Sequence, residues 1–192
     1  MKRVPFTAFL IAMAPVVVFA HTGTDHGAHH FANGLLHPFT GLDHILAMAA
    51  IGMWSVQLGG RARWSVPLGF LALMVVGGSL ALSHASMPFV ESGILASVLI
   101  MGLLVMFALR LPMPAAVALA GLFAIFHGYA HIAEMPPTAS TFAYGSGFIL
   151  ASAALLAAGA ALARLLTIAR QLQWLRLFGG ATAMAALLLA IS

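Results

Sequence analysis

Six long apolar segments occupy most of this chain and leave it few ways to fold. They lie at residues 35–58, 64–85, 92–109, 115–133, 141–163 and 174–191. Each is close to the roughly 20 residues that a helix needs to cross a bilayer core. None alternates polar and apolar residues as a barrel wall does, so helices are the remaining way to pair the backbone in lipid. With 62% hydrophobic and 6% charged residues, the chain cannot cover a water-soluble surface. The sequence predicts an all-α, polytopic membrane protein, with a bundle of six transmembrane helices in residues 35–192.

The chain begins with the features of a secretory signal peptide. Lys2 and Arg3 precede an apolar stretch that is too short for a comfortable span, and small residues end it at Ala20. We therefore predict a signal peptide at residues 1–20, cleaved after Ala20. A His-rich extracytoplasmic segment at residues 21–34 follows, which we expect to form a loop. An uncleaved signal anchor is the alternative.

Ionisable side chains sort by sign onto opposite ends of the apolar segments. The connections that carry cations alternate with those that carry none. The cations are Arg61, Arg63, Arg110, Arg164 and Arg170, with Arg176 at the start of the last segment. Basic connections face the cytoplasm, which predicts a protein of the bacterial inner membrane with both termini in the periplasm. The periplasmic face then carries the carboxylates and imidazoles without a competing cation. This is a suitable setting for a divalent metal ion.

The first motif, HPFTGLDH, opens the first apolar segment. His37 and His44 are seven residues apart, which places them within about 20° on one face of a helix. Pro38 suits the first turn of that helix. Asp43 lies off the stripe, where it could bind a metal directly or orient His44. A capping histidine with a purely structural Asp–His pair is the alternative, but burying an aspartate in a membrane segment is costly and usually serves function.

The second motif, FHGYAHIAEMP, closes the fourth apolar segment. His127, His131 and Glu134 stand at i, i+4 and i+7 and form one stripe along a helix. An i, i+4 histidine pair can chelate one ion, and a carboxylate one turn on adds negative charge. Gly128 leaves the adjoining surface open for another helix. A single histidine in such a span would more often be a structural residue, whereas three aligned polar groups favour a site.

Weaker candidates lie on the same side of the membrane. They are His21, Asp25, His26, His29, His30, His84 and Glu91. Glu91 could equally serve as a carboxylate at a helix N-terminus. The chain contains no cysteine, so the ligands must be nitrogen and oxygen, with methionine sulfur as an extra. Met48, Met87 and Met135 lie near the motifs, and their thioethers would suit Cu(I).

Both motifs resemble the signatures of a known family. HPFTGLDHILAM and FHGYAHIAEMP are similar to the two signatures of the HupE/UreJ family, accessory proteins of hydrogenase and urease systems that are regarded as nickel permeases. The resemblance extends over the mature chain, with one motif in the first span and one in the fourth. It implies the metal ligands His37, Asp43, His44, His127, His131 and Glu134. Ile132 stands where a second small glycine is expected, which affects local helix packing rather than the ligands.

The expected function is a permease that takes a divalent transition metal from the periplasm into the cytoplasm through a site between the first and fourth spans. Ni²⁺ follows from the resemblance, because imidazole suits Co²⁺, Zn²⁺ and Cu as well. An intramembrane zinc-dependent hydrolase and a membrane metallochaperone are the alternatives. The expected partners are the metal ion, membrane lipid and a hydrogenase or urease maturation system. No organic cofactor is expected, and singly spread arginines argue against nucleic acid.

Overall fold

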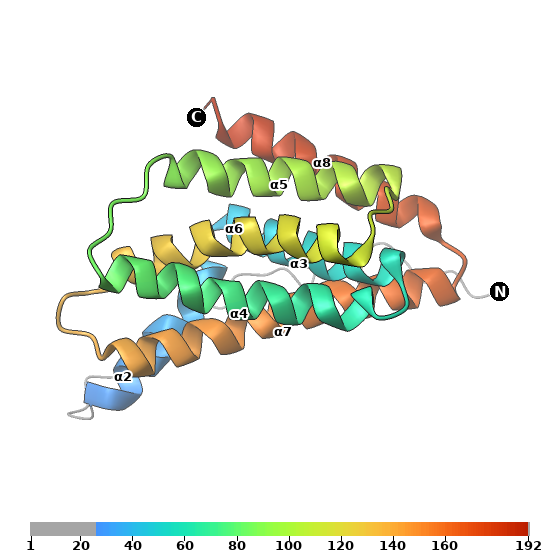
Figure 1. The fold of residues 1–192 in the computed structure, drawn as a ribbon. Helices are drawn as coiled ribbons and strands as arrows, with labels where there is room; N and C mark the ends of the chain where they lie inside the picture. Colours follow the sequence, from blue (N-terminus) through green and yellow to red (C-terminus); the bar gives the residue numbers. More distant parts are fainter. Residues whose placement is uncertain (1–25, 192) are drawn as a thin grey trace.

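The structure is a computed structural model that describes residues 26–191, and its regular elements are all helices. They are α2 (His26–Leu36), the 3₁₀ turn η1 (His37–Phe39), α3 (Leu42–Leu58), α4 (Ala62–Leu82), α5 (Val90–Phe107), α6 (Met113–Ala133), α7 (Thr141–Ile168) and α8 (Leu172–Leu189). The long helices lie side by side, with α5 and α8 along one edge and α2 and α7 along the other (Figure 1). The predicted all-α membrane fold is confirmed. The predicted signal peptide and its cleavage after Ala20 lie outside the described residues.

The helices match the predicted spans closely. Five of them, α4 to α8, are long and apolar enough to cross a membrane, and a sixth span results if the bent pair that includes α3 is counted as one. Four of these five begin and end within about three residues of the predicted segments. The exception is α7, which continues to Ile168. Arg164 therefore lies inside this helix, and the connection to α8 is shorter than predicted.

The first predicted span, residues 35–58, is not a single helix. The HPFTGLDH motif contains the break: the helical segments that end at Phe39 and begin at Leu42 are bent by 77° relative to one another. Pro38 has no backbone N–H and occupies the first turn of η1, and Gly41 is extended with φ −103° and ψ 121° before α3 begins. The sequence predicted that His37 and His44 lie on one face of a single helix. This prediction is wrong, because the two residues belong to different elements. They approach the site from opposite sides of a bend.

The predicted loop at residues 21–34 is wrong from His26 onward, because α2 occupies residues His26–Leu36. This helix lies along α7 (Figure 1), and the two backbones touch at glycines. A methyl group at Gly34 would collide with the carbonyl of Tyr144, and one at Gly147 with the carbonyl of Phe31. Tertiary packing thus stabilises a helix whose own sequence favours it weakly.

Reciprocal glycines also bring α4 and α6 together. A methyl group at Gly77 would collide with the carbonyl of Ile125, and one at Gly128 with the carbonyl of Met74. Close approach of backbones at small residues is the usual way in which membrane helices pack. The predicted role of Gly128 in admitting a neighbouring helix is confirmed. Because α6 carries the second motif, this contact also sets where its histidines lie.

Two further glycines near Ile132 differ in how closely they pack. Gly78 faces the side chain of Ile132, whose Cγ1 would lie 3.0 Å from an added Cβ. This small residue on α4 makes room for the isoleucine that departs from the expected motif. Gly145 does not mediate close packing, since an added Cβ would meet only Ile132 Cδ1, at 4.0 Å.

Candidate metal centre

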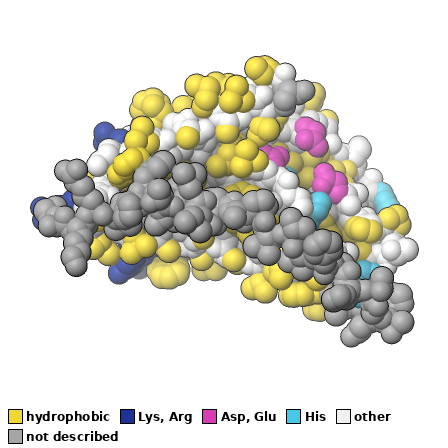
Figure 2. All heavy atoms as spheres, turned by 180° about the vertical axis from the view of Figure 1, so that it is seen from behind, with side chains coloured by type: hydrophobic (Ala, Val, Ile, Leu, Met, Phe, Trp, Pro, Cys, Tyr) yellow, Lys and Arg dark blue, Asp and Glu magenta, His cyan; other side chains and the backbone are white. Residues whose placement is uncertain are grey.

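All the carboxylates of the described residues line one cavity. The cavity measures about 200 Å³ and is lined by His37, Thr40, Gly41, Asp43, His44, Glu91, Ile94, His131 and Glu134. It lies at the end of the bundle opposite the arginines. Figure 2 shows the dark blue cations at one end of the visible face, and the magenta carboxylates and cyan imidazoles toward the other. The cavity therefore joins acidic and imidazole side chains without a basic residue among its lining.

An inner group of three buried histidines includes two that line this cavity, His44 and His131, and a third, His127, beside them. His44 comes from α3, whereas His127 and His131 come from consecutive turns of α6. Each offers a ring nitrogen, and the three nitrogens lie within 4.8 Å of one another. The side chains are buried, with His127 at 0% and His131 at 1% exposure. The structure thus brings together histidines from both motifs, close enough to share one ion.

Several nitrogens of the inner group have no partner. His44 Nδ1 lies 2.8 Å from Asp43 Oδ1, which also accepts a hydrogen bond from the His44 backbone N–H at 2.9 Å. His44 Nε2, His127 Nδ1 and both ring nitrogens of His131 are buried without a hydrogen-bond partner among residues 26–191. Buried polar atoms are normally paired. Unpaired imidazole nitrogens that converge in this way fit the donor set of a transition-metal ion.

An outer group overlaps the inner one. His37, His131 and Glu134 also offer ligand atoms that lie within 4.8 Å of one another. His37 Nε2 is 3.2 Å from Glu134 Oε2, and these side chains are 29% and 52% exposed. The ring of His131 lies 4.7 Å from that of His37 and 4.2 Å from that of His44, measured between centroids. His131 therefore belongs to both groups and stands between solvent-accessible and buried ligands.

Aromatic side chains that sequence reasoning missed form the wall of the site. The ring centroid of Phe148 lies 3.8 Å from that of His131, and Phe70 lies 5.9 Å from His127. Tyr144 lies 5.9 Å from His37 and is almost fully buried. Nothing in the sequence separates these residues from ordinary apolar positions of a span. Their bulk excludes water, and a lower local dielectric strengthens the attraction between an ion and its ligands.

Gly41 makes room for the Asp43–His44 pair. A Cβ at this position would lie 2.6 Å from Asp43 Oδ1 and 2.8 Å from His44 Nδ1. The carboxylate can fold back over the start of α3 only because this side chain is absent. The glycine of the first motif thus has a steric reason, which spacing alone does not reveal.

The weaker candidates separate in the structure. Glu91, at the start of α5, lines the cavity, whereas His84 lies in the α4–α5 connection outside it. The two metal-binding groups found among the described residues include neither His29 nor His30. His30 Nδ1 instead accepts a hydrogen bond from the Ser140 backbone N–H at 3.0 Å. His21 and Asp25 lie outside the described residues, as does the side chain of His26.

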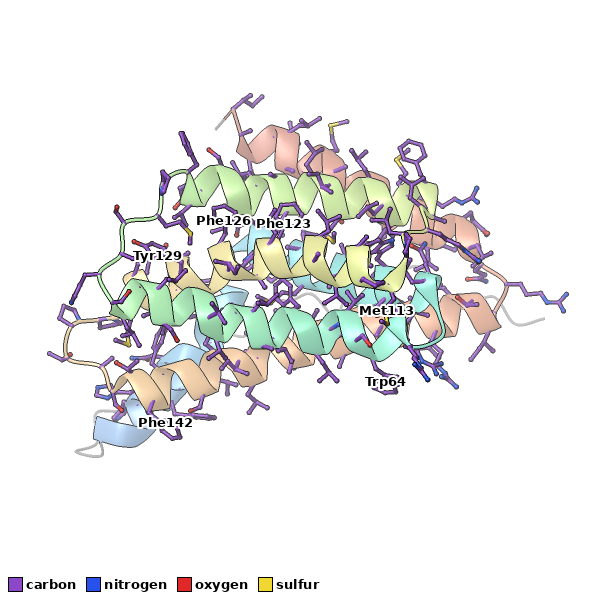
Figure 3. The ribbon with its side chains drawn as sticks, in the orientation of Figure 1. Trp64, Met113, Phe123, Phe126, Tyr129 and Phe142 are labelled. Atoms are coloured by element: carbon purple, nitrogen blue, oxygen red, sulfur yellow. The ribbon has the colours of Figure 1, made fainter. Side chains whose placement is uncertain are left out.

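Two other observations bear on the motifs. Tyr129 donates a hydrogen bond through its hydroxyl to the Ala85 carbonyl at 2.9 Å, so this motif residue fixes the α4–α5 connection (Figure 3). Met48 is fully buried in the hydrophobic core. No methionine belongs to the described residues that line the cavity. The possible metal ligands that line the cavity are therefore nitrogen and oxygen atoms.

Comparisons with known proteins agree with the motifs. The model of the family described as HupE / UreJ protein matches residues 8–189. "Protein HupE" of Rhizobium leguminosarum bv. viciae is 42% identical over 153 residues, which cover 79% of this chain and 79% of that protein. No solved structure matches the chain. The family match spans nearly the whole sequence, including both motifs. The chain therefore belongs to the HupE/UreJ family.

Proposed function

We propose that the protein is a permease that carries Ni²⁺ from the periplasm into the cytoplasm across the bacterial inner membrane. Its family consists of membrane proteins of the transporter type that are linked to nickel and cobalt handling, so the hydrolase alternative is set aside. One observation carries the proposal for this chain. Three carboxylates and three histidines line a single cavity, and unpartnered imidazole nitrogens lie at its inner end.

The two overlapping groups suggest the order of events. Glu134 and Glu91 raise the local concentration of cations at the exposed cavity. The ion then binds His37, His131 and Glu134, and exchanges these ligands for His44 and His127. Because His131 belongs to both groups, it can hold the ion throughout this exchange. Ligand replacement in single steps avoids the cost of a bare ion in a membrane interior.

The packed core closes the route on the far side of the inner group. Met48, Phe70 and Met101 are fully buried in the cluster that fills the middle of the bundle. This packing supports a transport cycle in which the described state is open toward the carboxylates and closed, by the buried cluster, toward the arginines. Passage requires a shift of helices, which the glycine contacts between them would permit as sliding surfaces. The inside-negative potential favours inward movement of a divalent cation by about 4.6 kcal/mol per 100 mV, twice the value for one charge.

Uptake by purified protein in liposomes tests the proposal directly. We expect accumulation of ⁶³Ni²⁺ that depends on the protein, with unlabelled Ni²⁺ and Co²⁺ competing more strongly than Zn²⁺. Empty liposomes and a Ser55→Ala protein are the controls, since Ser55 is buried on α3 and donates its hydroxyl to the Gly52 carbonyl. If the protein binds Ni²⁺ at equilibrium but the liposomes accumulate none, the permease proposal is wrong and a metallochaperone is favoured. Stronger competition by Zn²⁺ would contradict nickel as the substrate.

Neutralising the carboxylates at the cavity should weaken capture of the metal. We expect Glu134→Gln and Glu91→Gln each to raise the KM for nickel by roughly tenfold, a loss of about 1.4 kcal/mol. Maximal uptake should fall less, because neither residue belongs to the inner group. His84→Gln is the matched control at the same end of the bundle. An unchanged KM in both Glu variants would show that the carboxylates take no part in capture.

The orientation of the protein in the membrane decides whether the cavity faces the periplasm. It can be tested by labelling introduced cysteines, because the chain contains none of its own. Ser86 and Gln171 are exposed residues in connections at opposite ends of the bundle. A membrane-impermeant maleimide added to intact spheroplasts should label Ser86→Cys and should label Gln171→Cys only after the membrane is broken. The reverse pattern would place the carboxylate-lined cavity in the cytoplasm and contradict uptake.

A further inference from the structure

Ser97 reaches the metal centre from α5, a helix on which neither motif lies. Its side chain is fully buried. The hydroxyl oxygen lies 2.6 Å from the Ile94 carbonyl and 3.0 Å from His127 Nε2. No charged residue of α5 other than Glu91 belongs to the cavity lining. Among the described hydrogen bonds, the one made by Ser97 is therefore the only one that joins α5 to a ring of the inner group.

The proton count fixes the direction of both hydrogen bonds. A serine hydroxyl has one proton, and a carbonyl oxygen can only accept. At 2.6 Å, the Ser97 hydroxyl donates its proton to the Ile94 carbonyl. In the hydrogen bond with His127 the ring must then be the donor: its Nε2–H donates to a lone pair of Ser97 Oγ. A neutral His127 consequently carries its proton on Nε2 and a free lone pair on Nδ1.

The free nitrogen is the one that lacks a partner. His127 Nδ1 is buried and has no hydrogen-bond partner among residues 26–191. His44 shows the complementary arrangement, since Asp43 contacts its Nδ1 and leaves its Nε2 unpaired. The ring of His44 lies 4.9 Å from that of His127 at an interplanar angle of 85°. Each ring is thus held by a hydrogen bond on one nitrogen and is unpaired on the other.

We infer that Ser97 is a positioning residue that holds His127 in the Nε2–H tautomer and presents its Nδ1 lone pair to the metal ion. The inference rests on the proposed function, because it assigns this lone pair to the transported ion. Partners of this kind fix the tautomer and ring orientation of a metal-binding histidine. Asp43 does this for His44, whereas an uncharged hydroxyl does it for His127. A neutral partner leaves the buried ring without a second fixed charge, which limits the cost of burial.

Nickel binding by purified protein tests this assignment. Ser97→Ala should weaken binding by roughly 10- to 100-fold, the usual effect of losing such a partner. Ser97→Thr keeps the hydroxyl and should recover most of the affinity. Ser55→Ala is the matched control, because Ser55 is equally buried and donates to the carbonyl three residues before it, at 2.7 Å. Circular dichroism verifies that each variant retains its helices.

Nitrogen NMR of metal-free protein measures the tautomer of His127, which would not change on replacing Ser97 if this serine were only structural. In protein labelled with ¹⁵N-histidine, the His127 signals, assigned by their loss in His127→Gln, should show the Nε2–H tautomer. Ser97→Ala should mix the two tautomers. A proton on Nδ1 in the wild type, or wild-type affinity in Ser97→Ala, would overturn the inference. An Nε2–H tautomer in a protein that binds no nickel would support the positioning by Ser97 and overturn the proposed function.

Discussion

Replacement of His131 by alanine should abolish nickel uptake while the helix bundle stays folded. His131 is the one residue shared by the inner and outer groups, so its loss leaves both with two ligands. Its ring nitrogens make no hydrogen bond to the described residues, so the substitution breaks no such bond. We expect uptake at limiting metal to fall at least a hundredfold, equivalent to about 2.7 kcal/mol of lost binding. The liposome assay measures this loss, and circular dichroism measures the fold.

The other histidines should show graded effects. His127→Ala removes a ligand of the inner group alone, and His37→Ala removes one of the outer group alone. We expect His127→Ala to lower affinity at equilibrium and His37→Ala to raise the KM, with smaller losses than in His131→Ala. His84→Ala, outside the cavity, should transport normally. Wild-type uptake by His131→Ala at limiting metal would contradict both the shared ligand and the transport site.

Local patterns predicted the long helices well. The segment that forms α6 is apolar except for the residues of the second motif, with prolines at residues 112 and 114 near its start and at 136 beyond its end. Proline favours the first turn of a helix and stops one that has ended. The i, i+4 and i+7 spacing of the second motif then placed its three polar groups on one face. These signals depend on neighbouring residues, which is why the sequence alone was sufficient.

The break in the first span depends on distant contacts and was missed. Residues 35–58 are apolar apart from the motif at their start and have the length of one span, and Pro38 by itself indicates a helix start. The preceding helix, α2, forms where Gly34 and Gly147 let it lie on α7. Those residues are more than 100 positions apart, and no local pattern connects them. The bend has a functional consequence, because it directs His37 and His44 to the same histidine from two sides.

The candidate ligands were predictable because their chemistry is rare in a membrane, whereas their supports were not. Carboxylates and imidazoles are costly in lipid and attract notice wherever they occur. Ser97 resembles any serine that bonds to the carbonyl of the preceding turn, as Ser55 does. Its role emerges only when α6 brings His127 against it. Whether Glu91 lies at the cavity was likewise open in the sequence, and the packing of α5 places it there.

Substitution of Gly128 by alanine should prevent the bundle from forming correctly, although this residue binds nothing. An added methyl group would collide with the carbonyl of Met74. The obstacle is backbone and cannot rotate away, so α4 and α6 must separate along their contact. Overpacking typically costs about 1–3 kcal/mol and occasionally more, and a backbone collision belongs at the upper end. We expect a much lower yield of monodisperse protein and a lower midpoint of thermal unfolding in detergent.

Gly145→Ala is the matched comparison, and we expect it to leave the stability of the bundle unchanged or to raise it. An added methyl group there meets only Ile132 Cδ1, at 4.0 Å, which is ordinary van der Waals contact. Alanine in a helix is more stable than glycine by roughly 0.5–1 kcal/mol, so this variant should unfold at an equal or higher temperature. If Gly128→Ala were as stable as Gly145→Ala, α4 and α6 could not be packed as closely as described. His127 and His131 lie on either side of Gly128 on α6, so the geometry of the inner group depends on that packing.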